Sequence, residues 1–291
     1  MWEMQKLLKE LEGEDAVVRR DATEALRRMG PAAVEAAPQL IKALNDESSW
    51  VRSSAAEALG NMGCTAAEAV PQLMKALDDA ESFVRSSAAG ALGNMFPAAT
   101  AAVPQLITAL DDEDSFVRRR VAEALRRMRP EAAEALPQLI KALEDKDSFV
   151  RSSAAETLGN MGCAAAEAVP HLMKALDDEE SFVRSSAAGS LGKMGHSALG
   201  KMGPPAEAVP RLIQALGDED LLVRTSAAEA LGPLGPAAAE VFMSTALLRE
   251  SLIPVLALTD VTEPAHGSLL QLRFLNEQAT CKSAFQSVKF H

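Results

Sequence analysis

The sequence predicts an all-α protein built as an α-solenoid of about seven helix pairs, each 33 residues long. The first observation is a strict period: the dipeptide Val-Arg recurs after 33 residues five times and then once after 40. The second is composition. Hydrophobic residues make up 48% of the chain but aromatic residues only 4%, which favours helices packed closely through small side chains. The arginines that mark the period are Arg19, Arg52, Arg85, Arg118, Arg151, Arg184 and Arg224.

Each repeat reads as two helices joined by an acidic turn. The first helix resembles AAEAVPQLMKALDD at 66–79, with a proline in its first turn, where the missing N–H costs little. The second resembles SWVRSSAAEALGNMG at 49–63. Its apolar residues Val51, Ala55, Leu59 and Met62 form a helical stripe, and Gly60 and Gly63 are expected to end it. A short polar or acidic residue precedes each second helix as its expected N-cap: Asp15, Ser48, Glu81, Asp114, Asp147, Glu180 and Asp220.

The array is expected to span residues 1–248, with seven helix pairs and an extra first helix. The step of 40 residues coincides with LGKMGHSALGKMG at 191–203, where an eight-residue unit is written twice. Residues 249–291 leave the pattern, so we expect a non-repeat C-terminal cap or tail that is partly disordered.

The recurring segments VRSSAAEALGNMG and AVPQLMKAL resemble the short HEAT repeat of the phycobilin-lyase (PBS lyase HEAT-like) type. The resemblance covers residues 1 to about 248. The signatures of ankyrin and tetratricopeptide repeats are missing. The resemblance implies a HEAT/armadillo-like right-handed superhelix of helix pairs, in which the second helices line the concave side.

Charge and hydropathy argue against nucleic-acid-coating and membrane proteins. The net charge of −12 argues against a protein that coats nucleic acid or an anionic membrane. The start MWEMQKLLKELEGE has acids and no apolar run, so we do not expect it to be a signal peptide, and no apolar run in the sequence is long enough for a membrane span. We therefore expect a soluble intracellular, cytoplasmic protein.

A repeated acid–base pair predicts a structural ladder. An Asp lies six residues before each period-marking arginine except Arg19, and repetition at one register allows charge-assisted hydrogen bonds along the stack. An arginine-lined anion site is the alternative. The pairs are Asp46 and Arg52, Asp79 and Arg85, Asp112 and Arg118, Asp145 and Arg151, Asp178 and Arg184, and Asp218 and Arg224; Arg19 has no such aspartate.

An aromatic residue usually stands directly before Val-Arg, out of phase with the apolar stripe. We call these residues, Trp50, Phe83, Phe116, Phe149 and Phe182, the aromatic row. Two interpretations stay open. Each ring is wedged against the adjacent repeat and buried, or the rings form a spaced row of partner-binding anchors.

Arginines cluster on the second helix of the fourth repeat, on the face expected to be exposed. Arg119, Arg120 and Arg127 of this cluster are candidate partner-binding residues. Such a cluster is dense enough to hold a carboxylate or phosphate. The alternative is local pairing with Glu123, or with Glu24 in the first repeat.

Catalytic chemistry finds little support. Deoxyhypusine hydroxylase is similar in its helix pairs and holds iron with His-Glu dyads just after such an arginine; here those positions carry no His-Glu, for instance Ser53-Ser54. We interpret Cys64 and Cys163 as ordinary small apolar residues near a helix end rather than as nucleophiles. The Ser-Ser pairs are expected to be small solvent-facing residues without a catalytic role. The sequence predicts no catalytic residue, no metal and no cofactor.

Together these features predict a non-catalytic scaffold that binds another protein through the concave face of the solenoid. Two alternatives stay open: a bilin lyase-like or deoxyhypusine hydroxylase-like enzyme or enzyme subunit, and a nucleic-acid-binding HEAT protein.

Overall fold

The computed structural model describes residues 2–128, 133–194 and 205–232. Over these residues the protein is built from helices without strands, which confirms the predicted fold class. The chain forms two compact units, Met1–Ala164 and Ala165–His291. The extra first helix and the segment 249–291 expected after the seventh pair lie outside the described residues.

Fourteen α-helices of the described residues alternate as first and second helices of seven pairs. The first helices are α1 (Trp2–Glu10), α3 (Ala37–Ala43), α5 (Val70–Ala76), α7 (Val103–Ala109), α9 (Leu136–Ala142), α11 (Val169–Ala175) and α13 (Val209–Ala215). The second helices are α2 (Ala16–Met29), α4 (Ser49–Met62), α6 (Ser82–Asn94), α8 (Ser115–Met128), α10 (Ser148–Met161), α12 (Ser181–Met194) and α14 (Leu221–Leu231).

The first helices are shorter than expected. Over 63–69 the chain is a 3₁₀ segment, interrupted at Ala66 (φ −106°, ψ 30°), and the α-helix begins only at Val70. Pro71 explains the break because it has no N–H for a carbonyl one turn earlier and its ring crowds that carbonyl. Further 3₁₀ segments are Gly30–Ala36, Thr100–Ala102, Gly162–Ala168 and Ala206–Ala208, and the described residues 133–135 have the same conformation.

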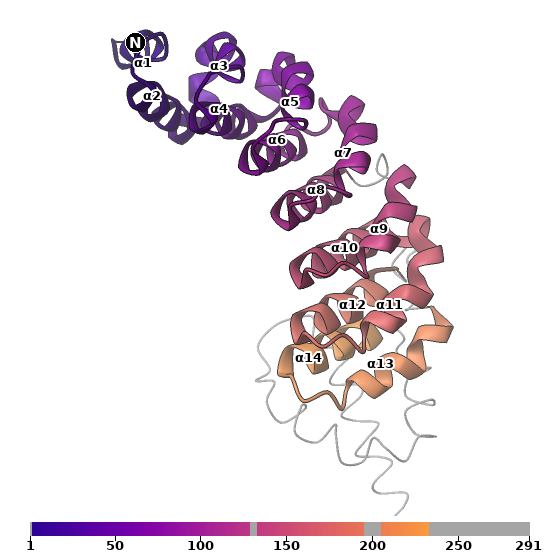
Figure 1. Ribbon diagram of the computed structural model, residues 1–291. Coiled ribbons are helices and arrows are strands. Elements are labelled where there is room, and N and C mark those ends of the chain that lie inside the picture. The colour runs from indigo at the N-terminus through magenta and orange to yellow at the C-terminus, as the bar shows by residue number, and fades with distance from the viewer. Residues whose placement is uncertain (1, 129–132, 195–204, 233–291) are drawn as a thin grey trace, which may run out of the picture. The chain divides into compact units, whose positions relative to one another are not determined.

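The helices form two layers. In the first unit, α2, α4, α6, α8 and α10 lie side by side, each packed against the next, and the first helices form the other layer (Figure 1). In the second unit α12 packs against α14, and α11 and α13 pair with them.

The predicted apolar stripe is the core of this packing. Val51, Ala55, Leu59 and Met62 are all buried, and burial of one such Leu stabilises the fold by about 1.5–3 kcal/mol. Gly63 ends α4 as expected: its φ of 60° lies in the left-handed region, and its N–H donates to the carbonyl of Gly60.

None of the helices in the described part of the chain combines the length and hydrophobicity that crossing a bilayer requires.

Candidate functional site

Ladder arginines connect neighbouring repeats. Arg118 donates from Nε and Nη2 to the carboxylate of Asp145, at 2.7 and 2.6 Å, and Asp145 belongs to the following repeat. Its Nη1 donates to the backbone carbonyls of Asp112 and Glu113, at 2.9 and 3.1 Å. The aspartate six residues before an arginine therefore offers it a carbonyl oxygen, and the carboxylate comes from one repeat further along.

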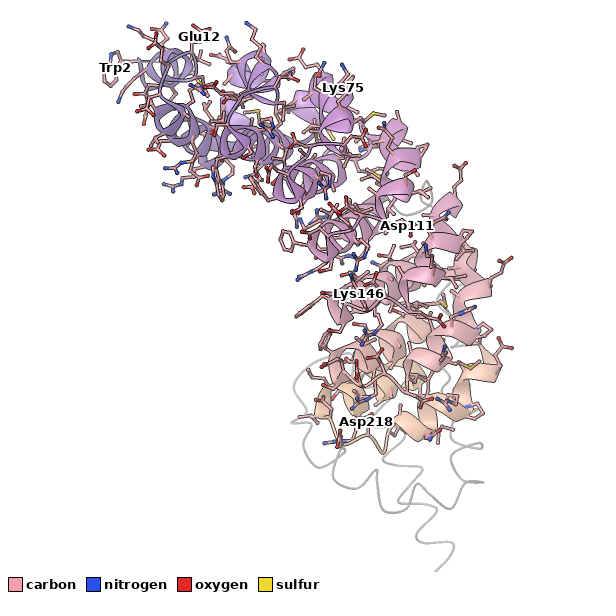
Figure 2. All side chains as sticks on the ribbon, viewed as in Figure 1. Trp2, Glu12, Lys75, Asp111, Lys146 and Asp218 are labelled. Atoms are coloured by element: carbon pink, nitrogen blue, oxygen red, sulfur yellow. The ribbon has the colours of Figure 1, made fainter. Side chains whose placement is uncertain are left out.

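The same bidentate pair recurs between neighbouring second helices in both units. It joins Arg19 to Asp46, Arg52 to Asp79, Arg85 to Asp112, Arg118 to Asp145 and, in the second unit, Arg184 to Asp218. Figure 2 labels Asp218 in the turn between α13 and α14. The pair Arg184–Asp218 spans 34 residues where the others span 27, so the longer sixth repeat leaves this contact intact. Arg151 and Arg224 donate to the carbonyls of Asp145 and Asp218 in their own turns.

The ladder carboxylates also accept a hydrogen bond from a backbone N–H of their own turn. Asp46 accepts the backbone N–H of Ser48, and the same contact two residues along the chain recurs at Asp79, Asp112, Asp145, Asp178 and Asp218. Burial raises the pKa of Asp46, Asp79, Asp145 and Asp218, but the hydrogen bonds from arginine and from this N–H outweigh it, so each pKa lies below its ordinary value. The hydrogen bond to aspartate, opposed by burial, raises the pKa of the partner arginines.

The aromatic row lies at the surface. Trp50, Phe116 and Phe149 are 62%, 55% and 53% exposed, while Phe83 and Phe182 are partly exposed. The burial interpretation is therefore wrong for Trp50, Phe116 and Phe149. The reason is phase: each ring sits one position before the buried Val of its helix, so it points away from the core stripe.

Two contacts join rings of the row to neighbouring second helices. Trp50 stacks on Phe83 with ring centroids 4.7 Å apart and an angle of 27° between the planes. The guanidinium of Arg119 lies over the ring of Phe149, 5.0 Å from its centroid, a cation–π geometry. One row position is thus covered by an aromatic ring and another by a cation.

The arginine cluster is partly neutralised within its own helix. Arg119 and Arg120 both pair with Glu123, at 3.2 and 3.0 Å, as the local-pairing alternative describes. Arg127 donates to the side-chain oxygen of Asn94 at 2.7 Å. In the first repeat, hydrogen bonds from Arg27, opposed by burial, lower the pKa of Glu24 to about 2.

Two local expectations were wrong. Gly60 does not end α4; a Cβ there would lie 2.7 Å from Cα of Ala91, so the glycine permits close approach of α6. The same relationship joins Gly93 to Ala124 and Gly192 to Ala230. The Ser-Ser pair of α6 and Ser53 of the α4 pair do not face solvent, because Ser53, Ser86 and Ser87 are buried and the hydroxyls of Ser53 and Ser87 are hydrogen-bonded at 2.9 Å.

In the described ranges, the cysteines and the possible metal-ligating side chains do not form a candidate catalytic or metal site. Cys64 and Cys163 are exposed in the 3₁₀ segments that follow second helices. No group of three or more His, Cys, Asp or Glu side chains in those ranges has a geometry that would hold a metal ion.

The geometry defines a class of protein: stacked antiparallel helix pairs with an inter-repeat arginine–aspartate ladder. A model of HEAT repeats matches residues 4–93, 84–159 and 103–192, a HEAT repeat model matches 208–238, and a PBS lyase HEAT-like repeat model matches 183–218. The chain belongs to the HEAT-repeat family, which confirms the resemblance seen in the sequence.

Three solved structures illustrate the similarity. One engineered protein is 28% identical with a TM-score of 0.56, over 67% of this chain and 97% of its own. A second engineered protein is 25% identical with a TM-score of 0.61, over 88% and 78%. Kap95p, in its complex with RanGDP, shares the fold at 16% identity and a TM-score of 0.60, over 95% of this chain and 41% of its own. Among proteins of curated function the search found no match.

Proposed function

We propose that this protein is a non-catalytic scaffold that binds another protein across its second-helix layer. The observation that carries the proposal is the exposure of the aromatic row: large rings occupy one helix position in successive repeats and remain more than half exposed at Trp50, Phe116 and Phe149. Solvent-exposed rings of this size at regular intervals are typical of binding anchors.

The ladder supports this role by fixing the spacing of the row. Trp50, Phe83, Phe116 and Phe182 each lie two residues before an arginine whose guanidinium is bonded to its own turn and to the next repeat, for example Arg118 after Phe116. A binding surface held this way loses little conformational freedom when a partner docks. The same fold engages a protein in the complex of Kap95p with RanGDP.

Site-specific photo-crosslinking tests the proposal. A photoreactive phenylalanine analogue would replace Phe116 in the row or, as the control, exposed Lys75 on α5, in the layer of first helices (Figure 2). In a native cell extract we expect a discrete protein adduct from position 116 and none of that mass from position 75. Equal labelling from both positions, or none from 116, contradicts the proposal.

A further inference from the structure

The chemistry of the partner follows from what surrounds the aromatic row. This step rests on the proposed function and concerns the part of the row formed by Trp50, Phe83 and Phe116 in the first unit. Three observations bear on it: the charge of the turns beside these rings, a cation already bound to one ring of the row, and the distance between repeats.

The turns beside these three rings are acidic. Residues 45–48, 78–81 and 111–114 contain nine aspartates and glutamates and no lysine or arginine. The ladder uses only Asp46, Asp79 and Asp112 of these. Exposed carboxylates remain beside the rings at Glu47, Asp78, Glu81, Asp111 and Glu113.

Some of these carboxylates also meet cations of the chain, without being buried by them. The side chains of Glu47 and Glu113 lie 3.2 and 3.6 Å from the ladder arginines Arg19 and Arg85, and they are still 83% and 89% exposed. Asp111 pairs with Lys141 at 2.6 Å, and both side chains are exposed. The field along this edge of the row therefore favours a cationic ligand.

The fourth repeat shows how the row holds a cation. Arg119 follows a ladder arginine, lies over the ring of Phe149 and pairs with Glu123. The equivalent residue beside Phe116 is Ser86, which is buried and too short to cover a ring. Phe116 thus presents an exposed ring next to exposed carboxylates at a position where this chain supplies no arginine.

The spacing of the acidic turns sets the spacing of cations in the ligand. Packed helices lie about 8–10 Å apart, so the acidic turns, one before each second helix, recur at about this spacing. The rings of Trp50 and Phe83 lean together to a centroid distance of 4.7 Å and form one stacked pair. A polyproline II chain rises about 3.1 Å per residue and turns once in three residues, so every third side chain faces the same way about 9 Å further on. A cation at every third residue would match the spacing of the acidic turns, one per repeat.

We propose that Trp50, Phe83 and Phe116, with their acidic turns, bind an extended arginine-rich segment of the partner in which arginines recur as Arg-x-x-Arg. Each partner guanidinium pairs with a carboxylate of one turn and lies against an exposed ring face, either of the Trp50–Phe83 stack or of Phe116, repeating the contact of Arg119 with Phe149. Arginine fits better than lysine because its planar guanidinium stacks on a ring while its N–H groups, which lie in that plane, donate hydrogen bonds to a carboxylate at its edge.

Binding of fluorescent peptides to the full chain tests this. The probe carries arginine at every third residue in a proline- and alanine-rich background. Comparison peptides have the same composition with the arginines clustered, or glutamate in place of arginine. We expect the probe to bind most tightly, and Phe116→Ser or Trp50→Ala to weaken it about 2- to 5-fold for each ring removed. Glu113→Gln should weaken it as well, and Lys75→Ala should not.

The outcomes are separable. Preference for the glutamate peptide, equal affinity for the clustered peptide, or binding unchanged in Phe116→Ser overturns the arginine proposal. Circular dichroism of each variant verifies that the fold is intact. If none of the peptides binds while position 116 still crosslinks to a protein, the partner chemistry is wrong and the scaffold function stands; absence of both results removes both.

Discussion

Arg118 on α8 bonds to both carboxylate oxygens of Asp145, across the boundary between two repeats, at 2.7 and 2.6 Å. The two side chains are only 6% and 14% exposed. Loss of one member would leave the other charge buried without its partner, so this contact belongs to the energetically sensitive class of ion pairs.

We expect Asp145→Ala to lower the free energy of unfolding by about 3–5 kcal/mol, because it leaves the Arg118 guanidinium buried without its carboxylate. Urea unfolding followed by circular dichroism measures the loss. The matched control is Lys141→Ala, which removes the exposed pair with Asp111 and should cost about 1 kcal/mol or less. Similar losses of stability in both variants would mean that the ladder pair contributes no more than an exposed surface ion pair.

Acid should weaken the ladder in a defined direction. The pKa values of Asp46, Asp79, Asp145 and Asp218 lie below the ordinary 3.8, so these carboxyls stay ionised in the folded protein where the unfolded chain takes up protons. Their stabilisation is complete well above pH 3.8 and is lost as the pH falls through the lower folded-state values.

The measurement is the urea midpoint as a function of pH. We expect it to fall below about pH 4, and to fall less steeply in Asp145→Ala because that variant has one such carboxyl fewer. Identical acid profiles for the variant and the parent would contradict this account of the ladder.

Two glycines in second helices should respond in opposite ways to alanine. A Cβ at Gly93 would lie 2.7 Å from Cα of Ala124, so Gly93→Ala must push α6 and α8 apart and should destabilise by about 1–3 kcal/mol. Gly189 in α12 has nothing within 4 Å of that position, so Gly189→Ala should stabilise by about 0.5–1 kcal/mol through helix propensity. Thermal unfolding of both variants checks the signs.

Exposure of the row predicts that its rings contribute little to folding. Phe116→Ser should change stability by no more than about 0.5 kcal/mol, because the ring is 55% exposed. Leu92→Ala on the neighbouring α6 should cost about 2–5 kcal/mol, since Leu92 is fully buried. A large loss from Phe116→Ser would assign the rings to the core and would remove the basis of the proposed binding face.

Much of the fold could be predicted from the repeat. The stripe through Val51, Ala55, Leu59 and Met62 is buried as its periodicity indicates, and Gly63 ends its helix with a positive φ. The first helices were overestimated because propensity and pattern do not reveal where Pro71 forces a 3₁₀ segment. The serine pairs were misread because a helical wheel gives the direction of a side chain but not the distance to the next helix.

The candidate site was harder to predict for the same reason. The phase of the aromatic row was correct from the sequence, yet its exposure depends on how the adjacent repeat covers it. The contact of Arg119 with Phe149 joins residues of two repeats and leaves no local signal.

By itself the sequence determined the period, the helix pairs, the core stripe and the family, because these follow from local propensity and from repetition along one chain. Only the tertiary structure decided which aspartate meets which arginine, which glycines allow helices to touch and which rings face solvent. Those contacts depend on the separation of stacked repeats, and Arg118 finds its carboxylate 27 residues ahead although another aspartate lies six residues behind it.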